Sequence, residues 1–340
     1  MRTHVILAVW LAAVVGLASA CTPAAEAHGG LRLGYFANLT HAPALIGLEQ
    51  GLYSDELDGP VSEQRFTAGP AAIEALSAGA VDAAYIGAAP IANSYVRSEG
   101  RSAVVVAGAT NGGAGLVVDP GRAEDLEAGR TALRDLRFAT PGLGNTQDVA
   151  LRSWLADQRL EPSLTGHGDV SIAPMSNSQI FTLFTTGSID AAWLAEPWAS
   201  RLVVDGGGTQ LLDEAELWPG GTHPSAVLAV NQDFLREQPE QVAALLRAHL
   251  TAIDFIHTQP EAAADTANHK LETDTGAALS AEVLSRAWKN LDFDADIPTA
   301  GLEAYHHQAV RTRLQPEGSL AGLTVTAPLD QVRSTQREGQ

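Results

Sequence analysis

The chain is short of cysteine, lysine and the usual catalytic motifs, and each shortage excludes a class of protein. Cysteine occurs once, at Cys21, so no disulfide can join two parts of the chain and its stability must come from packing. The sequence also lacks the C-x-x-C, G-x-S-x-G and phosphate-loop motifs. Their absence argues against the commonest redox, hydrolase and nucleotide-binding sites.

Positive charge is also scarce. Lys and Arg total 21 against 40 Asp and Glu, which gives a net charge of −19. Such a field repels a phosphate backbone, so we expect no nucleic-acid partner. It does not exclude a small anion, which responds to local dipoles rather than to net charge. Apolar residues make up 45% of the 340 residues, enough to build one large or two medium domains.

The N-terminus has the layout of an export signal. Arg2 precedes an apolar run over residues 5–17, and small residues then lead directly into Cys21. The run is shorter than the roughly 18–20 residues that span a bilayer. The small residues before the cysteine resemble the lipobox of bacterial lipoproteins. This resemblance implies a signal peptide over residues 1–20, a lipid on Cys21 and a flexible tether over residues 21–30; an ordinary cleaved signal is the alternative.

Strand-like and helix-like segments alternate through the first two thirds of the chain. The expected strands cover residues 32–36, 81–86, 103–107 and 137–140, and the expected helices cover residues 41–48, 71–78 and 146–157. This alternation predicts a mostly parallel α/β sheet. Past Asn231 the pattern becomes almost entirely helical, with Pro239 near a helix start and a strongly amphipathic stretch over residues 242–256.

One internal repeat indicates two similar units. Residues 76–85 and 184–193 each combine a helix end, a glycine, an aliphatic residue, Asp-Ala-Ala and an aromatic residue. The repeat predicts two α/β lobes with a ligand cleft between them, although any βα unit shares part of this pattern. Asp82 and Asp190 occupy equivalent positions, so we expect them to cap equivalent turns rather than to form an acid/base pair.

Four separated stretches carry a family resemblance. Residues 31–53, 67–90, 140–156 and 187–202 resemble the substrate-binding proteins of ABC importers, most of all the aliphatic sulfonate, taurine and nitrate group. The resemblance implies a periplasmic-binding-protein fold of type II, with two α/β lobes, a cleft between them and a helical C-terminal region. It also implies a monomer without cofactor or metal, tethered at the outer face of the membrane or periplasmic, which delivers a small anionic or zwitterionic solute to a permease and its ATPase.

The resemblance implies a domain layout as well. Lobe one would hold residues 31–112 and 226–330, with the C-terminal helices packed on it. Lobe two would hold residues 113–225, and residues 331–340 would form a disordered tail.

Several loops that each lead into a helix are candidates for the ligand site. Helix N-termini present unpaired N–H groups and positive dipole character, so such loops can hold a sulfonate or nitrate without lysine or arginine. Each loop alone could simply be a capped helix start. The residues expected to bind the ligand are Asn38, Thr40, His41, Gly69, Pro70, Gly87, Ala88, Asn111, Gly144, Asn145, Thr146, Gln147, Trp193 and Glu196.

The roles of two of these residues do not decide which ligand is bound. Trp193 could form an apolar wall for an alkyl chain or ring, or it could pack in the core. A carboxylate of Glu196 about 4 Å from a sulfonate would cost on the order of 4 kcal/mol at an effective dielectric near 20. Glu196 therefore caps a helix or pairs with Arg201, or else the ligand carries a cationic or N–H group, as taurine and a thiamine pyrimidine precursor do.

An enzyme or a sensor on the same fold is the second hypothesis. Synthases of thiamine precursors carry a cysteine-rich motif and a cofactor lysine, whereas this chain has no cysteine after Cys21 and only Lys270 and Lys289. The adjacent His306 and His307 point about 100° apart on a helix, so we expect a solvated face rather than a shared metal.

Overall fold

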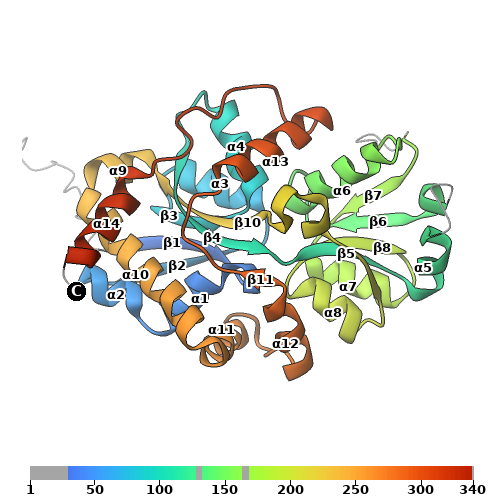
Figure 1. The fold of residues 1–340 in the computed structure, drawn as a ribbon, viewed down its shortest axis with the longest axis horizontal. Coiled ribbons are helices and arrows are strands. Elements are labelled where there is room, and N and C mark those ends of the chain that lie inside the picture. Colours follow the sequence, from blue (N-terminus) through green and yellow to red (C-terminus); the bar gives the residue numbers. More distant parts are fainter. Residues whose placement is uncertain (1–29, 128–131, 163–167, 339–340) are drawn as a thin grey trace, which may run out of the picture.

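The computed structural model describes residues 30–127, 132–162 and 168–338. Two lobes lie side by side along the long axis of the molecule, each built around its own sheet (Figure 1). The predicted signal peptide, Cys21 and all of the tether except residue 30 lie outside the described residues.

The first sheet has the strand order β11-β4-β10-β3-β1-β2. Strands β1, β2 and β3 are parallel, and β10 runs antiparallel to both β3 and β4. Its strands are β1 (Leu31–Phe36), β2 (Val61–Phe66), β3 (Ala83–Ile86), β4 (Ala103–Gly112), β10 (Pro224–Asn231) and β11 (Leu291–Asp292).

The second sheet repeats this plan with the order β7-β6-β8-β5-β9. Strands β6, β7 and β8 are parallel, and β5 runs antiparallel to β8 and β9. The prediction of two similar α/β lobes is confirmed. The strands are β5 (Ala114–Val118), β6 (Arg137–Thr140), β7 (Ser171–Pro174), β8 (Ala191–Ala195) and β9 (Thr209–Asp213).

Helices cover both sheets and then continue as a helical C-terminal region (Figure 1). Helix α6 has the predicted bounds, and α10 begins at Pro239, where the missing N–H costs nothing. The helices are α1 (Ala42–Glu49), α2 (Leu52–Leu57), α3 (Gly69–Ser77), α4 (Ala88–Arg97), α5 (Pro120–Glu127), α6 (Thr146–Asp157), α7 (Asn177–Thr185), α8 (Trp198–Val204), α9 (Gln232–Glu237), α10 (Pro239–Thr258), α11 (Pro260–Thr275), α12 (Ala281–Lys289), α13 (Thr299–Arg311) and α14 (Ala327–Glu338).

The chain crosses between the lobes at two adjacent points. The first crossing joins β4 to β5 through Gly112 and Gly113, whose φ angles of +73° and +68° favour glycine. The second crossing leads from β9 to β10, and the amide of Gly112 donates to the carbonyl of His223 on this segment at 2.8 Å. The two crossings are therefore hydrogen-bonded to each other.

Asp82 and Asp190 occupy equivalent places in the two lobes. Asp82 accepts hydrogen bonds from the backbone N (2.8 Å) and Nε (3.0 Å) of Arg32, at the start of β1. Asp190 accepts the same two bonds from Arg137, both at 2.8 Å, at the start of β6. The prediction that they cap turns is corrected, because each one instead joins two strands of its sheet.

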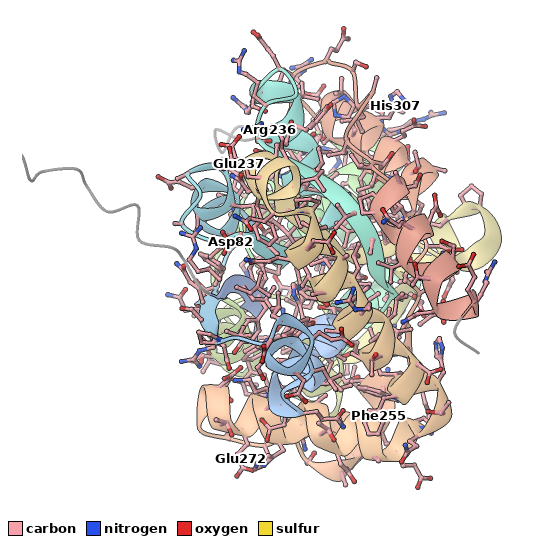
Figure 2. All side chains as sticks on the ribbon, turned by 90° about the vertical axis from the view of Figure 1, so that its left-hand side faces the viewer. Asp82, Arg236, Glu237, Phe255, Glu272 and His307 are labelled. Atoms are coloured by element: carbon pink, nitrogen blue, oxygen red, sulfur yellow. The ribbon has the colours of Figure 1, made fainter. Side chains whose placement is uncertain are left out.

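These aspartates lie away from the cleft. Asp82, labelled in Figure 2, precedes β3, and Asp190 precedes β8, so both sit at the amino ends of their strands. Hydrogen bonds from Arg137 hold the pKa of Asp190 below its usual value, so this carboxylate stays charged.

The C-terminal helices follow only in part the prediction that they pack on the first lobe. Helices α10, α11 and α14 do cover that lobe, but α12 packs on α8, and α13 contacts both α4 and α6. Arg311 of α13 donates to Asp157 of α6 at 2.6 Å and to the carbonyl of Ser153 at 3.1 Å. Helix α13 thus bridges the two lobes (Figure 1).

Residues 331–338 are also helical rather than disordered. They belong to α14, which packs against α10. Leu329 and Val332 are buried on this contact, and Arg333 forms an ion pair with Asp296. The buried leucine and valine explain why this polar segment is held on the first lobe.

Candidate ligand site between the lobes

A small cavity of about 60 Å³ lies between the lobes. It is formed at the carboxyl ends of β1, β2 and β3 in the first sheet and of β6, β7 and β8 in the second, the usual ligand position in open α/β sheets. Its lining residues are Phe36, Asn38, Thr40, His41, Thr67, Gly69, Gly87, Pro90, Pro141, Asn145, Thr146, Gln147, Asn177, Ala195 and Ser225.

Four helices begin at this cavity. They are α3, α4, α6 and α7, and their first residues or N-caps are among the lining residues. The N-caps of α3 and α4 are Ala68 and Gly87, which have no side-chain acceptor for the first amides of their helices. Four helix dipoles with positive ends at one cavity favour a negatively charged occupant.

Two hydrogen bonds connect the lobes across the cavity. The Oδ1 atom of Asn145 accepts from the amide of Gly69 at 3.3 Å, and the Oγ1 atom of Thr146 accepts from the amide of Ala89 at 3.4 Å. Side chains of the second lobe thus cap helices of the first. A Cβ atom at Gly87 would lie 2.6 Å from Thr146 Oγ1, so the backbone there approaches closely only because residue 87 is glycine.

The lining is polar but uncharged. Among the described residues that form it, none is Asp, Glu, Lys or Arg. Burial lowers the pKa of His41 to about 3, so its ring is neutral near pH 7. The ring packs on Phe36, with 5.0 Å between ring centroids. An anion here would be held by dipoles and neutral hydrogen-bonding groups alone.

Residues 24–270 match the profile of the NMT1-like family. The chain belongs to this family. Similar solved structures include the nitrate-binding protein NrtA from Synechocystis (TM-score 0.76, 17% identity, 90% of this chain and 89% of that one). The alkanesulfonate-binding protein SsuA from Xanthomonas axonopodis, bound to MOPS, is another (TM-score 0.72, 18% identity, 88% and 98%). These similarities establish the fold as that of the two-lobed periplasmic binding proteins.

A relative found by sequence similarity adds a second comparison. The bicarbonate transport ATP-binding protein CmpC from Synechocystis is 25% identical over 251 residues, which cover 69% of this chain. The matched region spans 37% of the length of CmpC.

Eight of the residues expected to bind the ligand line this cavity. They are Asn38, Thr40, His41, Gly69, Gly87, Asn145, Thr146 and Gln147. Pro70 and Gly144 line an adjoining groove, which shares Pro90 with the cavity. Ala88 is buried at the start of α4, and Asn111 lies on β4 opposite Asp292.

Trp193 and Glu196 lie outside the lining. Trp193 is fully buried and donates from Nε1 to Glu214 at 2.7 Å, so the core-packing alternative describes it. Glu196 accepts from the amide of Ser200 in α8 at 3.0 Å and from Asn290 at 2.8 Å. The carboxylate therefore caps a helix, as the first of the three alternatives stated. Burial raises its pKa.

Several lining residues were not among the expected ligand-binding residues. Asn177 and Thr67 are single polar residues beside helix starts, a signal too common to be singled out. Ser225 lies at the start of β10, far along the chain from the other motifs. Phe36, Pro90, Pro141 and Ala195 complete the set, and all four lie within the stretches that carry the family resemblance.

Two findings on the described residues concern metal binding and membrane crossing. These residues contain no group of three or more His, Cys, Asp or Glu side chains arranged to hold a metal. Among the described helices, none combines the length and apolar character that a membrane crossing requires.

The adjacent histidines of α13 differ in their surroundings. His306 is buried and bonds to Gln315, which corrects its expected solvated position, whereas His307 is exposed (Figure 2).

Because two histidines are buried, we expect the free energy of unfolding to fall in acid. Burial lowers the pKa of His41 to about 3 and that of His249 to about 4, while an unfolded histidine titrates near 6.5. Between about pH 6.5 and 4 the unfolded chain binds protons that the folded chain does not. The unfolding free energy therefore falls as pH decreases, by up to about 1.4 kcal/mol per pH unit for each histidine.

Urea unfolding at a series of pH values measures this fall. The variant His41→Phe keeps the ring packing on Phe36 and removes one titrating group. Its slope against pH should be smaller than that of the natural chain by the contribution of one histidine. Equal slopes for the two proteins would contradict the assignment.

Proposed function

We propose that the protein is the solute-binding component of an ABC importer, whose lobes close on a small oxyanion and deliver it to a membrane permease. The observation that carries this proposal is the uncharged cavity at which four helices begin. The relatives support it, because CmpC is named for bicarbonate transport, NrtA for nitrate binding and SsuA for alkanesulfonate binding.

The size of the cavity favours a very small ion. The cavity of about 60 Å³ has room for a small ion without rearrangement of its lining. Nitrate, bicarbonate and methanesulfonate, with four or five heavy atoms, match this size. Taurine and buffer sulfonates such as MOPS require a wider cavity. Because Glu196 caps α8, it gives no reason to expect a cation on the ligand.

Titration calorimetry tests the proposal. We expect saturable binding of one ion per chain for at least one of nitrate, bicarbonate and methanesulfonate, and weaker binding of taurine. Binding should also raise the unfolding temperature, because roughly 2.7 kcal/mol of stability accompanies ligand at 100 times Kd. Failure of all small oxyanions to bind would overturn the proposal.

The proposal extends to the location of the protein. A lipid on Cys21 would hold the binding protein beside its permease at the outer face of the membrane. Replacing Cys21 by Ser should release a protein that binds its ligand unchanged but no longer sediments with membranes. Cell fractionation and calorimetry of the released protein measure the two parts. Loss of ligand binding in this variant would contradict a purely anchoring role.

An enzyme on the same fold is the weaker candidate. Lys270 donates to Glu63 at 2.6 Å and to Asp274 at 3.0 Å, and it joins α11 to β2. Lys289 lines a separate groove between α8 and α12. Neither lysine is among the residues that line the cavity, so a cofactor bound there would find no lysine to attach to.

A further inference from the structure

A second pocket, of about 350 Å³, lies between the two lobes and is called here the accessory pocket. It is bounded by α7 and α8 of the second lobe, and by α11 and the segment that leads into α12 (Figure 1). Its volume falls within the range of pockets that hold small organic molecules, roughly 300–1,000 Å³. The accessory pocket and the cavity share no lining residue.

Arg201 of α8 is the single cation in the described lining of the accessory pocket. Its guanidinium packs on the ring of Trp198, 4.4 Å from the centroid, and on that of Phe181, at 5.2 Å. Within the described part of the chain the guanidinium makes no hydrogen bond, and its ion pair with the half-exposed Asp205 is long, at 3.7 Å. The two rings thus fix a charged group whose N–H donors are available to a ligand.

The rest of the lining is largely apolar. Leu271 and Val283 are buried, Leu279 is half-buried, and Trp198 adds the surface of its ring. A guanidinium binds a carboxylate through two parallel N–H···O bonds. An apolar wall beside it stabilises the hydrocarbon part of the same molecule. This combination matches an organic carboxylate better than an inorganic ion, which would leave the apolar wall uncovered.

We propose that the accessory pocket binds a small organic carboxylate with an apolar body, that Arg201 holds the carboxylate, and that the occupant promotes closure of the lobes. The site lies outside the cavity in which the small ion is proposed to bind. Its coupling to closure rests on the proposed function, whereas the site itself does not.

The coupling follows from the position of the accessory pocket between the lobes. Ala37 lies in the chain between the cavity residues Phe36 and Asn38, and Ser178 follows the cavity residue Asn177. Helix α11 packs on α1 of the first lobe, whereas α7 and α8 belong to the second. An occupant that touches both sides binds more tightly when the lobes are closed. By linkage, the ion in the cavity then binds more tightly when the accessory pocket is filled.

Titration calorimetry of the full chain with sodium benzoate tests the site, with benzyl alcohol as an uncharged probe that keeps the ring. We expect one benzoate per chain, bound at least about tenfold more tightly than benzyl alcohol. Arg201→Gln should weaken benzoate binding by roughly 10- to 100-fold, because hydrogen bonds to a charged group are lost, and should leave benzyl alcohol unchanged. Arg201→Lys keeps the charge without the planar fork, so it should recover only part of the loss.

Two further variants separate the accessory pocket from general effects of charge. Arg97→Gln removes the same charge from a groove beside α3 and α4 that shares no residue with the accessory pocket, so benzoate affinity should change by less than about twofold. Ala278→Phe places a ring at an exposed position of the pocket wall, so it should weaken benzoate binding while Arg201 is unchanged. Thermal unfolding verifies that each variant is folded.

Competition distinguishes the accessory pocket from the cavity. Benzoate that displaces nitrate, bicarbonate or methanesulfonate from the chain would lie in the cavity, and the accessory site would be overturned. Absence of benzoate binding, or equal affinity in the natural chain and Arg201→Gln, would overturn it as well.

The same titrations measure the coupling. Saturating benzoate should lower the Kd of the small ion by at least about fivefold, and an unchanged Kd would overturn the coupling. If none of the three ions binds, the proposed function is wrong, while the dependence of benzoate binding on Arg201 still decides the accessory site.

Discussion

Replacing Gly87 by alanine is expected to weaken ligand binding by roughly 10- to 100-fold while leaving the fold intact. The added methyl group would lie 2.6 Å from Thr146 Oγ1, closer than two such atoms can approach. Gly87 belongs to the first lobe and Thr146 to the second, so the clash arises only when the lobes meet. Overpacking of this kind costs about 1–3 kcal/mol, which here is subtracted from the free energy of closure.

The fold should tolerate this substitution. Gly87 has φ −68° and ψ 153°, a conformation that alanine adopts without strain. Rotation of the Thr146 side chain would relieve the contact only at the expense of its hydrogen bond to Ala89. We therefore expect the unfolding free energy to change by less than about 1 kcal/mol, which urea titration measures.

A double-mutant cycle provides the control for Gly87→Ala. Thr146→Ala removes the atom with which the new methyl group collides. In that background, Gly87→Ala should have almost no further effect on the Kd measured by calorimetry. An equal loss of affinity in both backgrounds would mean that the clash between the lobes is not the cause.

Replacing Arg152 by methionine is expected to lower the unfolding free energy by about 3–5 kcal/mol. Arg152 and Asp148 are an ion pair on α6, with side chains that are 2% and 0% exposed and Nε 3.0 Å from Oδ2. Removing the arginine leaves a buried carboxylate without its main counter-charge, which is far more costly than losing a surface pair.

The same substitution should also disturb the ligand site. Asp148 accepts from the amide of Gly144 at 3.0 Å and from Thr140 at 2.9 Å, so it holds the loop that presents Asn145 and Thr146 to the cavity. An uncompensated buried carboxylate will move toward water, and this movement loosens the loop. We therefore expect weaker ligand binding in addition to lower stability.

A matched control involves a second ion pair of the same helix. Arg311 pairs with Asp157 at the end of α6, but both side chains are about half exposed. Arg311→Gln should cost less than about 1 kcal/mol, as exposed ion pairs do. Urea unfolding of the two variants compares them directly. A loss for Arg152→Met no larger than that for Arg311→Gln would contradict the role assigned to the buried pair.

Much of the fold follows from local sequence signals. Helix α6 and the start of α10 were predicted because apolar periodicity, a polar N-cap or a proline marks their bounds. Residues 76–85 and 184–193 predicted the duplicated lobes, because the same helix–glycine–strand unit occurs in both. The predicted ends of strands were less accurate where they depend on pairing with other strands. The strand predicted over residues 103–107 is β4, which continues to Gly112 because β10 and β11 extend beside it.

Features set by tertiary contact could not be read from the sequence. The amphipathic faces of α12 and α13 indicate that they pack, but not that they pack on the second lobe. Trp193 lies near the end of β8, where a ligand contact was plausible, yet its indole finds a partner in Glu214, 21 residues away. Asn177 and Ser225 enter the cavity lining only because the two lobes meet there.

The bridge made by α13 restricts how the two lobes can move. Two adjacent chain crossings, joined by a hydrogen bond, leave mainly rotation about one line as a degree of freedom. Helix α13 touches α4 on one lobe and α6 on the other, so we expect rotation to slide or break one of these contacts. The contact with α6 includes the half-exposed pair of Arg311 and Asp157, which is inexpensive to separate. We therefore expect α13 to limit how far the cleft opens, although none of its residues lines the cavity.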